Sequence, residues 1–419
     1  MVKIQPFNAL RYNKQKIRDL SKVMAPPYDV INKQQRKRYA LNSKYNAVHF
    51  DLPKGKNRLS AHNESKRLIE KWLSEGVLAY DKAPCIYIYS QKYKIGSTTK
   101  TRTGFLSLLE LQDKKTVLPH EKIFKKFKQE RFNLMKVTRA HLSPIFTFYP
   151  DEKNLISRLL ASAIKRKKAD VDILLDGVNE KLWCVSDEKF INKLKNLMKQ
   201  KRAFIADGHH RFEASMFLRG YFNKTRKKGG KKMPFDYTFA YFMSMQDKGL
   251  TILPTHRAIK YLPKGFSRDF LIEKLSQYFY VKELKNKQGL SQELSRQDKA
   301  GRHAFGFFFK GTFLVAVLKS TKGLNVGPEN LGVSILHSFI LPELLGTKEK
   351  IGSKRNIYYY RGKTESVKRV KSGEFKMAIF LNPTKVQEVK QIAQRGGKMP
   401  HKSTYFYPKL LTGLVIHKW

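Results

Sequence analysis

Hydrophobic and polar positions follow two different periods along this chain. Residues 85–90 and 103–111 are rich in β-branched and aromatic side chains, a pattern that predicts strands. Residues 61–75 instead place their apolar side chains on one stripe at helical spacing. The first third of the chain therefore predicts an α+β or α/β sheet domain. For the whole chain we expect the α+β class, with mixed sheets and surrounding helices.

The same mixture continues toward the C-terminus. Residues 125–139 form a basic helical pattern that leads into a strand at 143–149, so we expect the helix to bring its basic face near the end of that strand. A strand is favoured at 237–244, and a helix that Ser267 caps follows at 267–279.

The length of 419 residues exceeds that of a typical single domain. We expect a core lobe at 1–255 and a second α+β lobe at 256–419. Residues 223–233 hold too many like charges and too few apolar side chains to pack, which predicts a basic flexible loop.

Positive charge is in excess along nearly the whole chain. The 84 Lys and Arg outnumber the 34 Asp and Glu and give a formal net charge of +50. Such a protein attracts polyanions, so non-specific nucleic acid is an expected partner at low salt. The even spread of lysine favours a compositional bias over a specific nucleic-acid site, since neither zinc-finger spacing nor an aromatic RNA-binding motif accompanies it.

Two cysteines, Cys85 and Cys184, are too few for a disulfide framework or a closed cysteine zinc site. The first residues lack the apolar core of a signal peptide, and the apolar run at 305–318 is interrupted by Lys310 and is too short to span a bilayer. We expect a cytoplasmic protein that does not insert into membranes.

The best candidate for a functional centre is residues 207–213, Asp-Gly-His-His-Arg-Phe-Glu. An apolar strand at 203–206 precedes it and a helical pattern follows it, so the motif falls at a helix N-terminus, where backbone N–H groups and the helix dipole bind anions. We therefore expect a phosphate-bearing ligand there.

Each residue of this motif has a chemical role that it could fill. Gly208 forms the turn, and Arg211 offers a bidentate grip on a phosphate. His209 and His210 can donate to it or move a proton, with Glu213 placed three residues on to orient the imidazole of His210. Asp207 either caps the helix or holds a metal ion or a hydroxyl group.

Further motifs carry compatible chemistry. His120 and Glu121, in residues 118–122, offer a second proton-transfer pair or belong to an ordinary exposed loop. His256 and Arg257 follow a strand and repeat the pairing of histidine with arginine, which suits an anionic group. The stiff segment Ala-Pro-Pro-Tyr-Asp-Val at 25–30 is either a binding element or a rigid turn.

Residues 399–409 combine cations, hydroxyls and aromatics, with Lys402 and Ser403 suited to the wall of a phosphate or base pocket. No P-loop, dinucleotide fingerprint, metalloprotease helix or nucleophile elbow is present in the sequence. A nucleotide would therefore be bound by another architecture.

Taken in order, the motifs at 25–30, 118–122, 138–140, 207–213, 254–257, 381–384 and 399–409 resemble family 1015 of the domains of unknown function (DUF). The Gly-His-His-Arg core is also similar to the motif of the ParB and sulfiredoxin superfamily, whose members bind nucleotides there and include free-serine kinases. The two resemblances imply a ParB/sulfiredoxin-like core and add Arg139 to the expected ligand-binding residues.

The sequence departs from the family pattern at several points. Ile123, Lys126 and Phe127 stand where relatives usually have threonine and a glycine-proline pair, and His141 replaces a usual asparagine. Arg361 and Gly362 stand where an acidic residue is usual.

What the resemblance implies is a nucleotide-dependent phosphotransferase that acts on a small hydroxylated metabolite such as serine, with ATP or ADP and Mg²⁺ as cofactors. In this reading Arg211 binds phosphate, Asp207 places Mg²⁺ or the acceptor, and His210 or Glu121 accepts the hydroxyl proton. The alternatives are a nucleotide or nucleic-acid binding protein without turnover, and a phosphate-ester hydrolase that uses His120 and His210.

Overall fold

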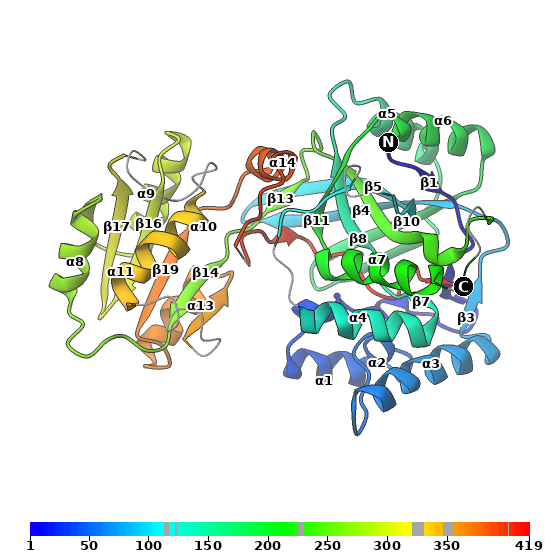
Figure 1. The fold of residues 1–419 in the computed structure, drawn as a ribbon, viewed down its shortest axis with the longest axis horizontal. Helices are drawn as coiled ribbons and strands as arrows, with labels where there is room; N and C mark the ends of the chain where they lie inside the picture. Colours follow the sequence, from blue (N-terminus) through cyan, green and yellow to red (C-terminus); the bar gives the residue numbers. More distant parts are fainter. Residues whose placement is uncertain are drawn as a thin grey trace. The chain divides into compact units, whose positions relative to one another are not determined.

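The computed structural model describes residues 1–112, 117–121, 125–224, 226, 230–320, 331–346, 356–400 and 402–419. It divides into two compact units (Figure 1). Unit 1 comprises Met1–Pro119, Ile123–Thr251 and Pro408–Trp419, and unit 2 comprises His120–Lys122 and Ile252–Tyr407. Both units combine sheets with helices, which confirms the α+β class.

Unit 1 is built on a mixed sheet that has nine strands in the part of the chain the structure describes. In spatial order they are β6 (Val117–Leu118), β11 (Ala203–Asp207), β8 (Ile145–Tyr149), β12 (Tyr237–Ser244), β5 (Thr98–Glu110), β4 (Ile86–Ile95), β10 (Val178–Val185) and β9 (Val171–Leu175), with β1 (Ile4–Gln5) beside β5. The pairs β8–β12 and β11–β6 are parallel and the other pairs are antiparallel.

Two short strand pairs complete unit 1, namely β2 (Leu10–Tyr12) with β3 (Leu78–Tyr80) and β7 (Ala140–His141) with β21 (His417–Lys418). The second pair ties the C-terminal end of the chain to the segment that follows α4. The final residues of the sequence are therefore part of unit 1.

The helices of unit 1 are α1 (Lys33–Asn42), α2 (Val48–Asp51), α3 (Arg58–Ser74), α4 (Lys125–Thr138), α5 (Leu155–Ile164), α6 (Glu188–Lys199) and α7 (His209–Asn223), with 3₁₀ turns η1 (Leu20–Lys22), η2 (Tyr28–Val30) and η3 (Pro234–Asp236). Figure 1 shows α7 between the sheet and α4, with α3 on the far side of α4. Phe132 of α4 and Leu218 of α7 are buried in one apolar cluster between these two helices.

Unit 2 is built on an antiparallel sheet whose described strands are, in spatial order, β15 (Phe279–Leu284), β17 (Thr312–Leu318), β16 (Ala304–Phe309), β19 (Met377–Leu381), β14 (His256–Ile259) and β18 (Ile357–Tyr360). Phe307 and Phe308 belong to different buried clusters, so both faces of β16 are covered. Burial on both faces explains why this stretch is continuously apolar and does not alternate.

The remaining elements of unit 2 are α8 (Arg268–Ser276), α9 (Lys287–Lys299), α10 (Gly332–Ile335), a π-helical turn η4 (Leu336–Ile340), α11 (Leu341–Leu345), α13 (Lys363–Lys371), α14 (Val386–Gln394) and β20 (Phe406–Tyr407). The short strand β13 (Thr251–Ile252) lies where the chain passes from one unit to the other.

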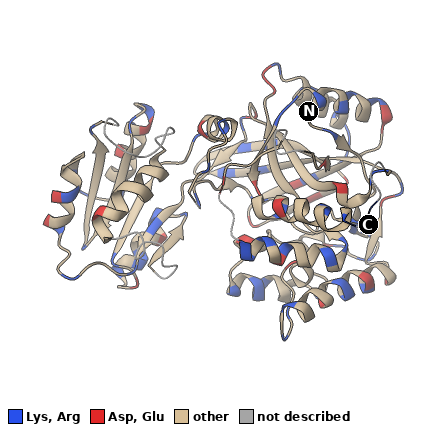
Figure 2. Ribbon diagram, in the orientation of Figure 1, with Lys and Arg blue, Asp and Glu red and all other residues tan. Residues whose placement is uncertain are grey.

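Charge is spread over both units. Figure 2 shows Lys and Arg on most helices, including α1, α3, α4 and α6 of unit 1. Part of the expected basic loop, residues 225 and 227–229, lies outside the described residues. Within its described part, Arg226 forms an ion pair of 2.7 Å with Asp236. No helix among the described residues is both long and apolar enough to cross a membrane.

Candidate functional site

The turn between β11 and α7 is held in a conformation that favours glycine. Strand β11 ends at Asp207 with a register shift against β8, and Gly208 then adopts φ +87° as the N-cap of α7. A Cβ atom at Gly208 would lie 3.0 Å from the guanidinium of Arg211. Since Gly208 has no side chain, it provides no side-chain cap for the first turn of α7.

The side chain of Arg211 folds back under this turn. It is buried, and its Nη1 donates to Ser143 Oγ at 3.1 Å and to the carbonyl of Pro144. Its Nη2 contacts Asp207 Oδ2 at 3.4 Å. In this structure the Arg211 guanidinium therefore contacts β8, β11 and the turn, and the bidentate phosphate grip expected of it stays a prediction.

Lys409 places a second cation beside the carboxylate of Asp207. Its Nζ lies 3.1 Å from Asp207 Oδ2, and its side chain is 10% exposed against 24% for Asp207. One carboxylate thus lies between two cations at the start of a helix. The excess of positive charge favours an anionic ligand at this point.

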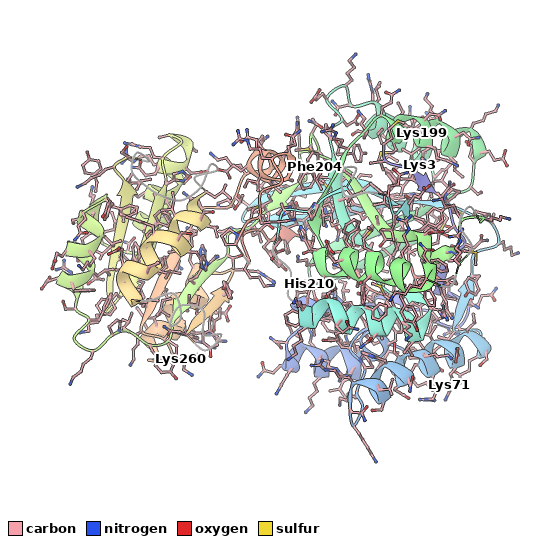
Figure 3. All side chains as sticks on the ribbon, in the orientation of Figure 1. Lys3, Lys71, Lys199, Phe204, His210 and Lys260 are labelled. Carbon is pink, nitrogen blue, oxygen red and sulfur yellow. The ribbon has the colours of Figure 1, made fainter. Side chains whose placement is uncertain are left out.

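Helix α4 begins beside α7 and runs in the same direction. Phe127 meets the ring of His210 edge-on at 5.4 Å, Phe132 meets Phe217 farther along, and Arg139 reaches Phe222 at the far end. The positive ends of two helix dipoles therefore lie side by side at the site. Figure 3 labels His210 at this end of the two helices.

The two histidines of the motif differ in exposure. His209 is buried and His210 is half-buried at the start of α7. Glu213 lies on the same helix, but among the described residues no hydrogen bond or ion pair joins it to His210. The orienting role expected of Glu213 stays a prediction.

The segment 25–30 also comes to this part of unit 1. The backbone N–H of Tyr28 donates to Asp51 Oδ2 at 3.2 Å, and the guanidinium of Arg131 stacks 3.8 Å from the Tyr28 ring centre. Arg131 also pairs with Asp51 at 3.2 Å. Burial raises the pKa of Asp51, while the charges of Arg131 and Arg211 oppose that rise. The cluster places a further buried guanidinium close to the motif.

His120 and Glu121 belong to unit 2, together with residues 399–403. The carbonyl of His120 accepts the N–H of Met399 at 2.6 Å, and Glu121 Oε1 lies 3.5 Å from the N–H of Lys402. Ser403 donates its hydroxyl to the carbonyl of Pro400. The structure thus brings 120–121 and 399–403 together, whereas Lys122, Ile123 and His401 lie outside the described residues.

His256 and Arg257 are core residues of unit 2. Burial lowers the pKa of His256 to about 3, so its ring is neutral at pH 7 and its Nδ1 accepts the N–H of Leu381 at 3.3 Å. Arg257 is fully buried and donates to His337 Nε2 at 3.2 Å and to the carbonyls of Thr255 and Lys402. In this structure their polar atoms contact the backbone of strand β19, of Thr255 and of Lys402, and the anion-binding role expected of them stays a prediction.

Arg139 does not lie at the motif. It follows the last turn of α4, with φ +51°, and its guanidinium lies 4.4 Å from the ring of Phe222. Phe222 is near the C-terminal end of α7, roughly 20 Å along the helix from its start at 1.5 Å per residue. Arg139 therefore packs between helix ends, and its ligand-binding role stays a prediction.

The described residues hold no group of three His, Cys, Asp or Glu side chains suited to a metal ion. Asp207 already contacts Lys409 and Arg211. These residues do not fit a resident metal. They are compatible with Mg²⁺ that arrives on nucleotide phosphates, because Mg²⁺ needs only one or two protein carboxylates in such sites.

Lys409 and Ser143 are the residues that sequence reasoning did not connect with the motif. Lys409 ends the 399–409 segment, about 200 positions from Asp207, and the only signal was its place among aromatics and hydroxyls. No local spacing predicts such a contact.

Fold and site together define an α+β protein with a glycine turn between strand β11 and helix α7. The chain belongs to the family described as Protein of unknown function (DUF1015), whose profile matches residues 4–335. No curated protein matches the chain.

Several solved structures share a distant likeness. A conserved hypothetical protein from Pyrococcus furiosus is 14% identical, with 70% of this chain and 87% of that chain covered and a TM-score of 0.35. A free serine kinase in complex with AMP is also 14% identical, with coverage of 70% and 83% and a TM-score of 0.36. SbnI with a C-terminal truncation, from Staphylococcus aureus, is 10% identical, with coverage of 74% and 86% and a TM-score of 0.36.

Proposed function

We propose that this protein binds a nucleotide through its phosphates at the start of α7 and transfers a phosphoryl group to the hydroxyl of a small metabolite such as serine. The observation that carries the proposal is the pairing of Lys409 with Asp207 beside the glycine turn, where α4 and α7 both begin. Two helix N-termini and a partly exposed ammonium favour polyphosphate over a neutral ligand.

In the reaction, the bond between the terminal phosphorus of the nucleotide and its bridging oxygen breaks, and a bond from phosphorus to the metabolite oxygen forms. The nucleotide leaves with the bridging oxygen and its electron pair, and the metabolite hydroxyl gives up its proton. His210, half-buried against Phe127, is the proposed acceptor of that proton. Lys409 and the α7 amides stabilise charge on the transferred group, while Arg211 keeps the turn in place. Mg²⁺ on the phosphates would neutralise part of their charge.

The test is phosphorus NMR of the purified protein with Mg²⁺, ATP or ADP, and a pool of hydroxylated metabolites that includes serine. We expect a new phosphoester signal. Replacing Lys409 by Ala should weaken nucleotide binding roughly 10- to 100-fold, the range for loss of a hydrogen bond to a charged group. The matched control is Lys199→Ala, an exposed lysine at the end of α6 (Figure 3), which should leave binding unchanged.

A second candidate, binding without turnover, is favoured by one specific observation. Asp207 is flanked by two cations, and the described residues offer no metal-ligand cluster beside it. Nucleotide that binds in a Lys409-dependent manner but stays unchanged in every mixture would select this candidate. Absence of any nucleotide binding would overturn both.

A further inference from the structure

The segment that carries Lys409 is held by buried side chains of the unit 1 sheet. Gln91 on β4 donates from Nε2 to the carbonyl of Lys409 at 3.0 Å, and Arg102 on β5 donates from Nη2 to the carbonyl of Pro408 at 2.6 Å. The backbone N–H of Leu411 stabilises the oxygen of Tyr89. Gln91 and Arg102 are fully buried and Tyr89 nearly so.

These three side chains form a connected network with Glu180 on β10. Glu180 accepts from Tyr89 Oη at 2.6 Å and from Gln91 Nε2 at 3.1 Å. Gln91 Oε1 in turn accepts from Arg102 Nε at 2.7 Å. Strands β10, β4 and β5 are neighbours in the sheet (Figure 1), so the network crosses three strands and ends on the backbone of 408–411.

Glu180 is the acidic end of this network. Burial raises the pKa of Glu180 to about 7, although its hydrogen bonds from Tyr89 and Gln91 and the charge of Arg102 act in the opposite direction. The ionisable groups that face Glu180 are Tyr89 from β4, Arg102 from β5 and Tyr241 from β12. No described acid other than Glu180 hydrogen-bonds to Gln91.

Protonation changes what Glu180 can do. As a carboxylate it accepts from both donors, whereas as a carboxylic acid it carries an O–H and can no longer accept well at both oxygens. Either Tyr89 or Gln91 then loses its acceptor. Each of them contacts the backbone of 408–411, so either loss loosens the segment that holds the Lys409 ammonium on Asp207.

We propose that Glu180, Gln91 and Arg102 are positioning residues that fix Lys409 at the α7 turn, and that the charge on Glu180 controls anion binding at this turn. The proposal rests on the proposed function for its ligand. The positioning itself is a property of unit 1 that can be measured without any nucleotide.

The first measurement is the dissociation constant for ATP between pH 6 and 8, in wild-type protein and in Glu180→Gln. Wild-type affinity should fall roughly three- to tenfold as pH is lowered through 7, the range for loss of one neutral hydrogen bond. The Glu180→Gln variant should show the low-pH affinity at every pH, since its side chain cannot ionise. A pH profile in Glu180→Gln that matches wild type would overturn the proposal.

The second measurement is amide hydrogen exchange of the peptide spanning 408–412, without nucleotide and at one fixed pH of 8. Exchange should be faster in Glu180→Gln and in Gln91→Leu than in wild type, and unchanged in Lys92→Ala, an exposed neighbour of Gln91 on the same strand. Unchanged exchange in both network variants would show that the network does not hold the segment. Faster amide exchange in both network variants, together with no ATP binding by the wild-type protein, would support the network and contradict the proposed function.

Discussion

At the scale of single residues, Gly208 decides whether the site can form. Its φ of +87° is in the left-handed region, and the guanidinium of Arg211 occupies the space a Cβ would need. The side chain of Arg211 also contacts Ser143, Pro144 and Asp207. A substitution at Gly208 that displaces Arg211 would therefore disturb its contacts with β8 and β11. Glycine at this position thus allows α7 to begin directly beside the buried guanidinium of Arg211.

Replacing Gly208 by Ala should lower the free energy of unfolding by about 1–2 kcal/mol for the left-handed backbone alone, with a further loss from displacement of Arg211. The measurement is urea denaturation. Gly220→Ala is the control, because Gly220 lies inside α7 with open space around its Cβ position. That change should stabilise by about 0.5–1 kcal/mol. Equal effects at the two glycines would contradict this account of the turn.

At the scale of elements, the inner strand β14 of the unit 2 sheet contains two buried polar residues, His256 and Arg257. It pairs with β18 on one side and β19 on the other, and both His256 and Arg257 are buried. The folded state holds His256 neutral because burial lowers its pKa from 6.5 to about 3. In the unfolded chain the same ring binds a proton below about pH 6.5.

Acid should therefore destabilise unit 2 through His256. The unfolded state binds the extra proton, so stability contributed by the neutral ring is complete above pH 6.5 and is lost progressively as pH falls toward 3. The slope from one such group reaches about 1.4 kcal/mol per pH unit. Thermal or urea unfolding at pH 7 and pH 4.5 should show a smaller acid loss in His256→Asn, whose side-chain oxygen can still accept the N–H of Leu381. The same acid loss in wild type and variant would rule out His256 as a cause.

The arrangement of helices α4 and α7 explains why some predicted site residues lie far from the 207–213 motif. Helices α4 and α7 run in the same direction, so their N-terminal ends meet at the motif while Arg139 is carried to the opposite end. Lys409, absent from the expected set, arrives from a segment that pairs with β7 through the C-terminal strand β21. Sequence spacing along a helix could place His209, His210 and Arg211 at the start of α7. The contact of Lys409 with Asp207 forms only because the C-terminal segment 408–419 folds into unit 1.

At the scale of the whole molecule, the net charge of +50 is distributed over the helices of both units (Figure 2). Some of these cations are exposed and pair with a nearby acid on the same helix, as Arg67 does with Glu64. Such pairs are weak and screened by salt. We therefore expect any attraction of polyanions to come from the general charge and not from particular ion pairs.

Binding to double-stranded DNA should be independent of sequence and should fall steeply with salt. If several phosphates are contacted, affinity should drop by about a thousandfold or more between 50 and 200 mM salt. Filter binding of two unrelated duplexes, titrated over that range, is the measurement. Affinity that persists at 200 mM and differs between the duplexes would instead indicate a specific nucleic-acid site.

The sequence by itself determined the α+β class, the family, the strand and helix on either side of Gly208 and the position of the motif at a helix N-terminus. These follow from local periodicity and from a turn that only glycine tolerates well, and both are properties of neighbouring residues. The tertiary structure decided that Arg211, His256 and Arg257 turn inward, that Arg139 lies away from the motif and that Lys409 joins Asp207. These outcomes depend on burial and on packing between segments far apart in the sequence, such as Asp207 and Lys409, which are about 200 residues apart.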